Sequence, residues 1–253
     1  MSEAGSQVKQ AIVVRPAEDG PEISAGVGLQ QAIWGYSNID TVPEQMFVVA
    51  KKSGGHVLLA FDGEKTVGFA LAFAGIQESG AYLHSHMVGV IAEYQDRGVG
   101  RLLKLAQRKD ALARRIDLIE WTFDPLQLKN ARFNIARLGA IVRHYIPNFY
   151  GRSSSPLHAG LPTDRLVAEW WVRSKRVEEA VSGVPSKSAS SDAERIAIPT
   201  SIGQLRTSAV EEAAEIQGRV RTRFEELTAR GYAATGFELS KEEGAYVLEP
   251  YED

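Results

Sequence analysis

A short glycine-containing segment between an apolar strand and a helix constrains this chain more than any other part of its sequence. The segment reads Gln95-Asp-Arg-Gly98-Val-Gly100, and an amphipathic stretch follows it at once. Two glycines remove side chains that would keep the backbone from an anion, and the first amides of a helix have no acceptor inside that helix. Arg97 and Arg101 add positive charge beside those amides. The segment therefore predicts a phosphate-binding turn at a strand-to-helix junction.

Two other phosphate loops fit this segment less well. A Walker loop needs a glycine followed by a lysine, and no Gly-Lys pair occurs in the chain. A dinucleotide-binding fingerprint would need a third glycine at position 103, where the chain has Leu103. A glycine-rich turn that merely starts a helix is the plainer alternative.

The segment resembles motif A of the GNAT superfamily of N-acetyltransferases. Members of that family commonly read Val-x-Pro-Glu-Tyr-Arg-Gly-Lys-Gly-Ile-Gly, and Gln95 here stands for the arginine. Ala92 and Asp96 depart from the pattern without disturbing the glycines. The residues that match are Val90, Glu93, Tyr94, Gly98 and Gly100. The resemblance spans roughly residues 10–150.

Hydrophobic periodicity and turn residues predict the order β-α-α-β-β-β-α-β-α-β over the same region. Expected strands cover 12–15, 56–61, 66–73, 82–90, 117–123 and 140–145, and expected helices cover 22–34, 43–54, 98–115 and 127–138. Asp62-Gly63 predicts a tight hairpin turn. Because this is the order of the acetyltransferase fold, we predict an α/β (α+β) fold with a GNAT-like mixed, mostly antiparallel central sheet and helices on both faces.

The remaining residues predict a C-terminal extension. We expect an acyl-CoA-binding and catalytic domain at 1–160 and an extension at 161–253 that packs on or extends the same sheet. The extension reads as a strand at 165–172, a flexible loop near 182–194, a helix opened by a capping box at Ser208 and Glu211, and a hairpin at 232–239 and 244–248. This arrangement resembles a poorly characterised branch of the superfamily.

Composition excludes several classes of function. The 253 residues carry a net charge of −3 and no cysteine. No basic field therefore argues for nucleic acid or an anionic membrane, and disulfides, thiolate metal sites and a cysteine nucleophile are excluded. The N-terminus lacks an apolar signal segment, and no stretch approaches the roughly 18 apolar residues that span a bilayer. We expect a cytoplasmic protein without nucleic-acid or membrane partners, and a homodimer is left open.

The resemblance implies how acetyl-CoA or another acyl-CoA would bind as co-substrate. Its pyrophosphate would lie on the helix that begins in the glycine turn, and its pantetheine arm would follow the preceding strand. A backbone amide near Val90 would polarise the thioester carbonyl. Lys104, on the basic side of the helix, could meet the 3′-phosphate, although such residues usually form a solvated face. The implied cofactor-binding residues are Val88, Gly89, Val90, Gln95, Asp96, Arg97, Gly98, Val99, Gly100 and Arg101, with Asn130 on the helix after the fifth strand.

Transfer of an acyl group to an amine needs a base for the amine. His84 and His86 would share one face of a strand, and an imidazole with an unperturbed pKa of about 6.5 suits that role. They could equally be strand histidines without a chemical role. With Glu120 or Asp124 they could form part of a metal site, but no spacing supports this, so we predict no metal.

The leaving thiolate needs an acid, and here the chain departs from the family. Many members carry a tyrosine four residues before a Leu-Gly pair, and with the pair at Leu138-Gly139 that position is Ile135. Tyr145, Tyr150 or solvent could supply the proton instead, and we take Tyr150 as the candidate. For either tyrosine, packing is the plainer reading.

These features predict an acyl-CoA-dependent N-acyltransferase that transfers an acetyl or other short acyl group to a primary amine of a small molecule, with amino acids among the candidates. A peptide or protein N-acetyltransferase is the second enzyme reading. Because the usual tyrosine is missing, a sensor or scaffold that binds acyl-CoA without turnover is the third.

Overall fold

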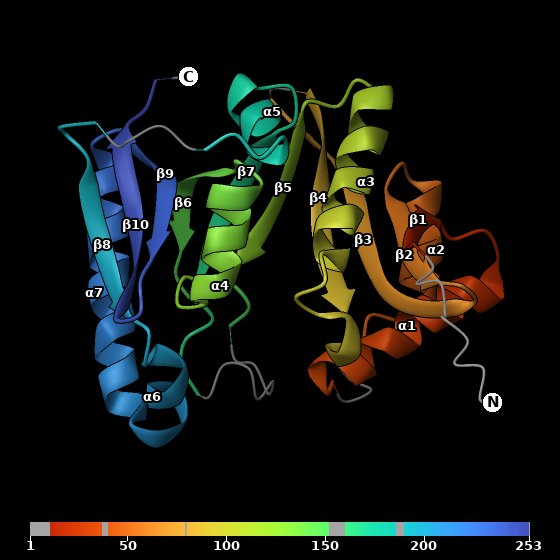
Figure 1. The fold of residues 1–253 in the computed structure, drawn as a ribbon, viewed down its shortest axis with the longest axis horizontal. Helices are drawn as coiled ribbons and strands as arrows, with labels where there is room; N and C mark the ends of the chain where they lie inside the picture. The colour runs from red at the N-terminus through yellow and green to blue at the C-terminus, as the bar shows by residue number, and fades with distance from the viewer. Residues whose placement is uncertain (1–10, 37–39, 79, 152–159, 186–189, 253) are drawn as a thin grey trace, which may run out of the picture. The chain divides into compact units, whose positions relative to one another are not determined.

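The computed structural model describes residues 11–36, 40–78, 80–151, 160–185 and 190–252 (Figure 1). The chain forms two compact units, Met1–Arg114 and Arg115–Asp253. The glycine turn belongs to the first unit, and the region around Ile135 belongs to the second.

The first unit is a four-stranded sheet with helices on both faces. Its strands pair antiparallel in the order β1-β2-β3-β4. Along the chain the elements are β1 (Val13–Pro16), α1 (Gly20–Trp34), α2 (Glu44–Lys52), β2 (His56–Asp62), β3 (Lys65–Gln77), β4 (Gly80–Val90), a 3-10 turn (Ala92–Tyr94) and α3 (Val99–Ala113). The predicted order of elements is confirmed in this unit.

Local chemistry explains several of these boundaries. The side chain of Asp19 accepts a 3.0 Å hydrogen bond from the Glu22 amide and so caps the start of α1. Gly35, with φ of 64°, ends that helix in the left-handed conformation. Gly63 also has a positive φ, of 59°, in the turn that joins β2 to β3. The predicted Asp-Gly hairpin is therefore confirmed.

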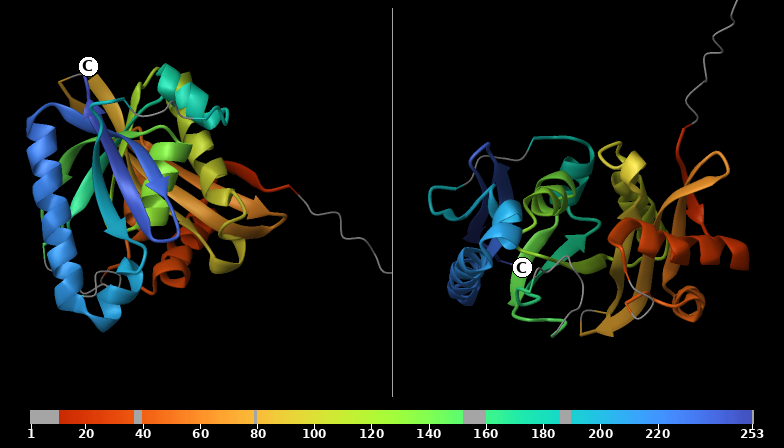
Figure 2. Two further views of the ribbon diagram at one scale, coloured as in Figure 1. Left: turned by 60° about the vertical axis from the view of Figure 1, so that its left-hand side comes forward. Right: turned by 90° about the horizontal axis from the view of Figure 1, so that it is seen from below.

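Alternate residues of the strands of this unit bury opposite faces. Leu59, Phe69 and Leu71 pack with Phe47 of α2, and α1 covers the same side. The other face packs against α3, which contributes Val99 and Leu103 to a second cluster. Figure 2 shows α3 and the α1–α2 pair on opposite sides of these strands.

The second unit contains six strands in the order β5-β7-β6-β9-β10-β8, with all neighbours antiparallel. The strand expected at 165–172 lies between β5 and β6. The hairpin strands continue the sheet from β6, where Val142 pairs with Ala234. The elements are β5 (Leu118–Phe123), α4 (Leu128–Ala131), a π-helical segment (Arg132–Arg137), β6 (Ile141–Ile146), β7 (Arg165–Trp171), α5 (Lys175–Val181), β8 (Glu194–Pro199), α6 (Ile202–Ser208), α7 (Val210–Ala229), β9 (Tyr232–Leu239) and β10 (Glu243–Pro250).

Some details of the second unit differ from the sequence predictions. α5, β8 and α6 were not predicted, and the helix after β5 becomes π-helical, with Leu138 N–H bonded to the carbonyl of Phe133 at 3.0 Å. The capping box was wrong. Ser208 ends α6, where its hydroxyl donates to the carbonyl of Gln204, and no side-chain hydrogen bond caps the start of α7 at Ala209. The domain division at 160/161 stays a prediction.

Candidate functional site

The glycine segment forms a left-handed turn immediately before α3. Asp96 and Gly98 have φ angles of 55° and 84°, and the first main-chain bond of the helix joins Leu102 N–H to the Gly98 carbonyl at 3.0 Å. No side chain in the described part of the chain caps this helix start. The amides of Val99 and Gly100 therefore lack an acceptor within the helix and carry its partial positive charge.

The two glycines are required for different reasons. Gly98 has a backbone conformation that L side chains rarely adopt. Gly100 lies inside the first helical turn, and an added Cβ would find its nearest neighbour, Val90 Cγ2, at 4.0 Å. Packing within the protein thus gives no reason for Gly100, although glycine in a helix costs about 0.5–1 kcal/mol relative to alanine. A bound anion that approaches this backbone closely would supply the reason, so the residues fit a diphosphate.

Side chains around the turn hold it in place. Tyr94 donates a 2.7 Å hydrogen bond to Asp62, and this bond raises the pKa of the tyrosine. Arg97 donates to the carbonyl of Glu93 at 3.0 Å and lies over the Tyr94 ring. Gln95 donates to the carbonyl of Val90 at 3.1 Å. The Gln95 and Arg97 side chains therefore brace the turn, and the Gln95 amide bonds to the carbonyl of Ala92 at 3.2 Å.

The two candidate histidines lie close together on β4. Their ring centroids are 6.2 Å apart, and His86 also meets the ring of Phe73 edge-on at 5.7 Å. Sequence reasoning missed a bulge here. Ala72 pairs with Ser85 and Leu71 pairs with Met87, so His86 is the extra residue of the strand. Bulges re-aim side chains and are frequent beside active sites.

Partial desolvation of the His86 ring lowers its pKa, and the nearby charge of His84 lowers it further. The neutral imidazole is the form that accepts a proton. Because the ordinary value is about 6.5, a lowered pKa keeps His86 in this form at neutral pH.

The remaining residues predicted to line the pantetheine arm lie at the end of β4. Val88 and Val90 are half-buried and pack against the cluster that contains Val99 of α3. Gly89 is buried, and an added Cβ would lie 2.9 Å from Trp34 Cη2. The packing of α1 on the strand therefore explains Gly89 without a ligand.

The predicted exposed face of α3 was partly wrong, because Lys104 is only 3% exposed. Its Nζ donates to the Ser85 hydroxyl at 2.9 Å, and burial lowers its pKa well below the ordinary value. Lys104 therefore does not belong to a solvated basic face. The helix turns Val99, Leu103, Lys104, Gln107 and Ala111 toward the sheet.

A buried chain of hydrogen bonds runs from Lys104 across the first unit. Ser85, which accepts from Lys104, donates to Gln107 at 3.0 Å, and the Gln107 amide lies 2.9 Å from His56 Nε2. His56 Nδ1 lies 2.9 Å from the carboxylate of Asp110. Each group can donate to the next in one direction along this chain. Residues 104, 107 and 110 are polar and three apart, so they share one face of the helix. This spacing could have indicated the hydrogen-bond chain from the sequence.

The second unit holds the other predicted residues. Asn130 is half-buried on α4. Asn134, in the π-helical segment, is 1% exposed, and its amide nitrogen has no acceptor among the residues that the structure describes. Ile135 is fully buried at the position of the family's tyrosine. Isolated π-helical turns often mark functional sites, so Asn134 joins the candidates that sequence reasoning missed.

The two tyrosines considered as acids have different surroundings. The Tyr150 hydroxyl lies 3.3 Å from the Thr122 hydroxyl, its ring lies under the Arg165 guanidinium, and the residue is 48% exposed. Tyr145 donates to Asp164 at 2.5 Å, and burial together with that carboxylate raises its pKa strongly. Tyr150 is therefore the more accessible hydroxyl of the two.

Within the described ranges, no three histidine, aspartate or glutamate side chains gather so that they could hold a metal ion. Nor does any helix in those ranges have the length and apolar character needed to cross a bilayer.

No protein-family model matches the chain, and no curated protein matches it significantly. Solved structures do match. The ribosomal-protein-S18-alanine N-acetyltransferase of Escherichia coli has a TM-score of 0.52 at 13% identity, over 64% of this chain and 94% of that one. The protein yncA of Salmonella typhimurium, solved with its cofactor acetyl-CoA, has a TM-score of 0.52 at 18% identity, over 64% and 95%. A GNAT-family acetyltransferase of Streptococcus pneumoniae has a TM-score of 0.50 at 15% identity, over 63% and 98%. This chain therefore has the fold of the GNAT acetyltransferases.

Proposed function

We propose that this chain is an acyl-CoA-dependent N-acyltransferase that acts on a primary amine of a small molecule, with acetyl or another short acyl group as the group transferred. The start of α3 carries the proposal, because it offers uncapped amides and no close neighbour at Gly100, where an added Cβ would lie 4.0 Å from Val90 Cγ2. The GNAT fold supports the same activity, as does the structure of yncA with acetyl-CoA.

Bound acyl-CoA would supply an activated thioester. The Val99 and Gly100 amides would hold its diphosphate at the helix mouth, and Arg101 would add positive charge. Gln95, Asp96, Arg97 and Gly98 would shape the turn. Val88, Gly89 and Val90 would offer backbone groups to the pantetheine arm. The side-chain amide of Asn130 or Asn134 would form a hydrogen bond to the same arm.

The acceptor amine must lose a proton before it can attack the thioester. His86 is poised for this because its lowered pKa leaves the ring neutral near pH 7. His84, with its ring 6.2 Å from that of His86, is the second candidate base. Tyr150 would return a proton to the leaving thiolate.

One observation favours a second function. Ile135 is buried where the family commonly has its acid tyrosine, and a chain that lacks that acid could bind acyl-CoA as a sensor. Peptide acceptors also remain candidates, because one similar structure is an N-acetyltransferase of a ribosomal protein.

Calorimetry with CoA thioesters, followed by thiol-release assays, tests these functions. Acetyl-CoA and succinyl-CoA would be offered with pooled amino acids, polyamines and short peptides. We expect binding and turnover in the wild type, and loss of both in Gly98→Asp. The control is Gly28→Asp, at an exposed position of α1 with open space around it. Absence of binding to every CoA thioester would overturn the proposal, and binding without turnover would favour the sensor.

A further inference from the structure

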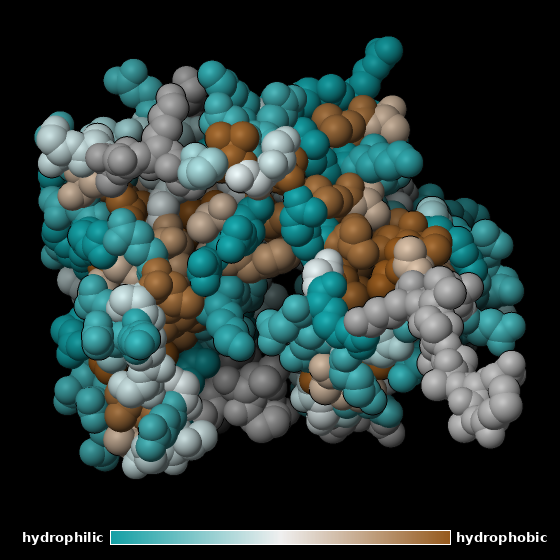
Figure 3. Space-filling model, in the orientation of Figure 1, coloured by the Kyte–Doolittle hydropathy of each residue, from teal (hydrophilic) through white to brown (hydrophobic). Residues whose placement is uncertain are grey.

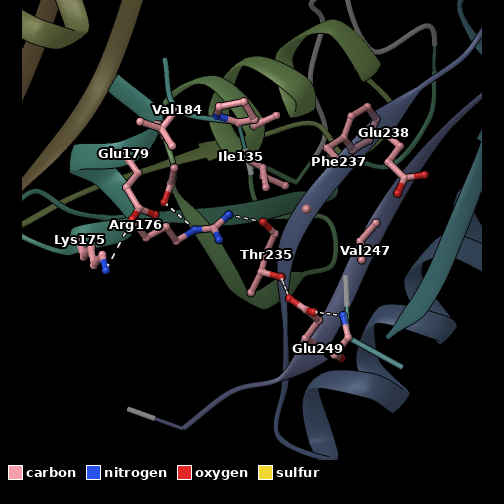
Figure 4. A pocket seen from close by; sticks show the side chains of 16 residues that line it. Ile135, Lys175, Arg176, Glu179, Val184, Thr235, Phe237, Glu238, Val247 and Glu249 are labelled. Carbon is pink, nitrogen blue, oxygen red and sulfur yellow. Dashed lines mark hydrogen bonds and ion pairs between the residues drawn. The ribbon is translucent and has the colours of Figure 1, made fainter. Parts of the chain in front are cut away.

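A pocket of about 500 Å³ lies wholly within the second unit, between the π-helical segment, α5 and the β9–β10 hairpin (Figure 4). This volume falls in the range of roughly 300–1,000 Å³ that small-molecule sites occupy. Its apolar lining includes Ile135, Val184, Phe237 and Val247. Figure 3 shows hydrophobic residues reaching the surface over β9 and β10 between hydrophilic ones.

A second β-bulge shapes this pocket. Val247 pairs with Gly236 and Leu248 pairs with Ala234, so Thr235 is the extra residue of β9. Its carbonyl accepts a hydrogen bond from Arg176 Nη2 instead of joining the strand ladder. Its hydroxyl donates to Glu249 at 2.6 Å. The bulge therefore turns both polar groups of Thr235 toward the pocket residues, as Figure 4 shows.

Arg176 keeps an unused donor in the pocket. Its Nε donates to the Gly139 carbonyl at 3.1 Å and its Nη2 to Thr235. Nη1 has no acceptor among the described residues and is not shut off from solvent. Burial lowers the pKa of this guanidinium, but an arginine stays charged at neutral pH. A half-buried guanidinium with a free N–H pair is a strong donor to a carboxylate.

The charges around the pocket nearly cancel. Glu249 is held ionised, because its bonds to the Thr235 hydroxyl and the Ser190 amide lower its pKa. Glu238 pairs with Arg195 of β8 at 2.5 Å. Glu179 lies one helical turn after Arg176, and its only ion-pair partner among the described residues is the highly exposed Lys175, at 3.8 Å. This balance favours a zwitterion over a phosphate.

We infer that this pocket binds a small zwitterion with an apolar side chain, of the class of aliphatic α-amino acids. Arg176 Nη1 would take the carboxylate and Glu179 the ammonium group. Ile135, Phe237 and Val247 would surround the side chain. The inference goes beyond the proposed function, because the pocket contains no residue of the glycine turn.

Calorimetry of the full chain with L-leucine, without any CoA, tests the inference. We expect leucine to bind, and leucinamide and 4-methylpentanoate to bind at least about tenfold more weakly, because each lacks one charged end. Since no CoA is present, failure here is distinct from failure of the proposed function. Absence of binding by leucine, isoleucine and valine would overturn the inference.

Variants separate a binding role from a structural one. Glu179→Gln keeps the shape of the side chain and should weaken leucine binding about tenfold while affecting 4-methylpentanoate little. Glu178→Gln, on the exposed side of the same helix, is the matched control and should bind leucine normally. Arg176→Lys should also bind leucine more weakly, but this change can disturb the hydrogen bonds to Gly139 and Thr235. The result with Glu179→Gln is therefore the decisive test. Unchanged leucine affinity in Glu179→Gln would overturn the inference.

Discussion

Tyr94 and Asp62 are joined by a 2.7 Å hydrogen bond that fixes the glycine turn to the hairpin between β2 and β3. We expect Tyr94→Phe to weaken CoA binding several-fold, because the turn would lose this anchor while the aromatic ring under Arg97 remains. Calorimetry with CoA measures the effect. Tyr232→Phe in the second unit is the control and should bind CoA normally. Equal affinity in wild type and Tyr94→Phe would show that the bond does not matter for the site.

Gly100→Ala should raise the stability of the fold and lower the affinity for CoA. An added Cβ would make only an ordinary contact with Val90 Cγ2, at 4.0 Å, in a helical turn, so the free energy of unfolding should rise by about 0.4–1 kcal/mol. The same methyl group would meet a bound diphosphate, so CoA affinity should fall. Urea unfolding and calorimetry give the two values.

Gly28→Ala in α1 is the matched control for that change, because Gly28 is also helical and has no atom within 4 Å of an added Cβ. It should raise stability and leave CoA binding alone. If Gly100→Ala bound CoA as the wild type does, close approach of a ligand to this backbone would be ruled out.

The two asparagines after β5 can be told apart by substitution. Asn134 buries an amide nitrogen that lacks an acceptor, and an unsatisfied donor of this kind costs about 1–3 kcal/mol. Asn134→Leu should therefore leave the free energy of unfolding unchanged or raise it, and we expect it to weaken CoA binding. Asn130→Ala should change neither quantity much, because Asn130 is half-buried on α4. If calorimetry showed weaker CoA binding in Asn130→Ala and normal binding in Asn134→Leu, the ligand contact would belong to Asn130.

His84 influences the titration of His86. Removal of water lowers the pKa of His86 first, and repulsion from His84 adds to it. His84→Gln should therefore raise that pKa toward its ordinary value of about 6.5. The acidic limb of the pH–rate profile should move to higher pH if His86 is the base. Proton NMR titration of the ring measures the shift, and His144→Gln, exposed on β6, should leave it unchanged.

The glycine turn and the order of strands could be predicted because their signals are local. Gly98 and the Asp62-Gly63 hairpin each depend on neighbours in sequence, and the structure bears them out. Bulges do not have such signals. Whether His86 or Thr235 becomes the extra residue depends on the pairing of two strands, which one strand's sequence does not specify.

Burial of polar residues was also beyond local reasoning. Lys104 looked like part of a basic surface because arginines follow it on α3. Lys104 can be buried because Ser85 of β4 lies beside it. The Ser85 hydroxyl accepts a hydrogen bond from Lys104 Nζ inside the protein. Asn134 was not singled out for a similar reason, since the π-helical segment changes which side chains face inward, and the role of Asn130 stays a prediction.

Asp110 makes the stability of the first unit depend on pH. Burial alone would raise the pKa of this carboxyl group, but the hydrogen bond from His56 and the charge of Arg114 outweigh it and lower the pKa. A carboxylate with a lowered pKa stabilises the fold above its unfolded-state value of about 3.9, and this contribution disappears as the pH falls through the lowered value.

Asp110→Asn should therefore lower the free energy of unfolding at pH 7, because His56 and Arg114 lose their anionic partner. The variant should also lose less stability than the wild type between pH 4 and the acid limit, roughly the range over which the aspartate takes up its proton. Urea unfolding at several pH values gives both curves. Asp117→Asn, at an exposed ion pair with Arg173, is the control and should run parallel to the wild type. A parallel curve for Asp110→Asn as well would show that the bond between His56 and Asp110 adds no pH-dependent stability to the packing of α3 on β2.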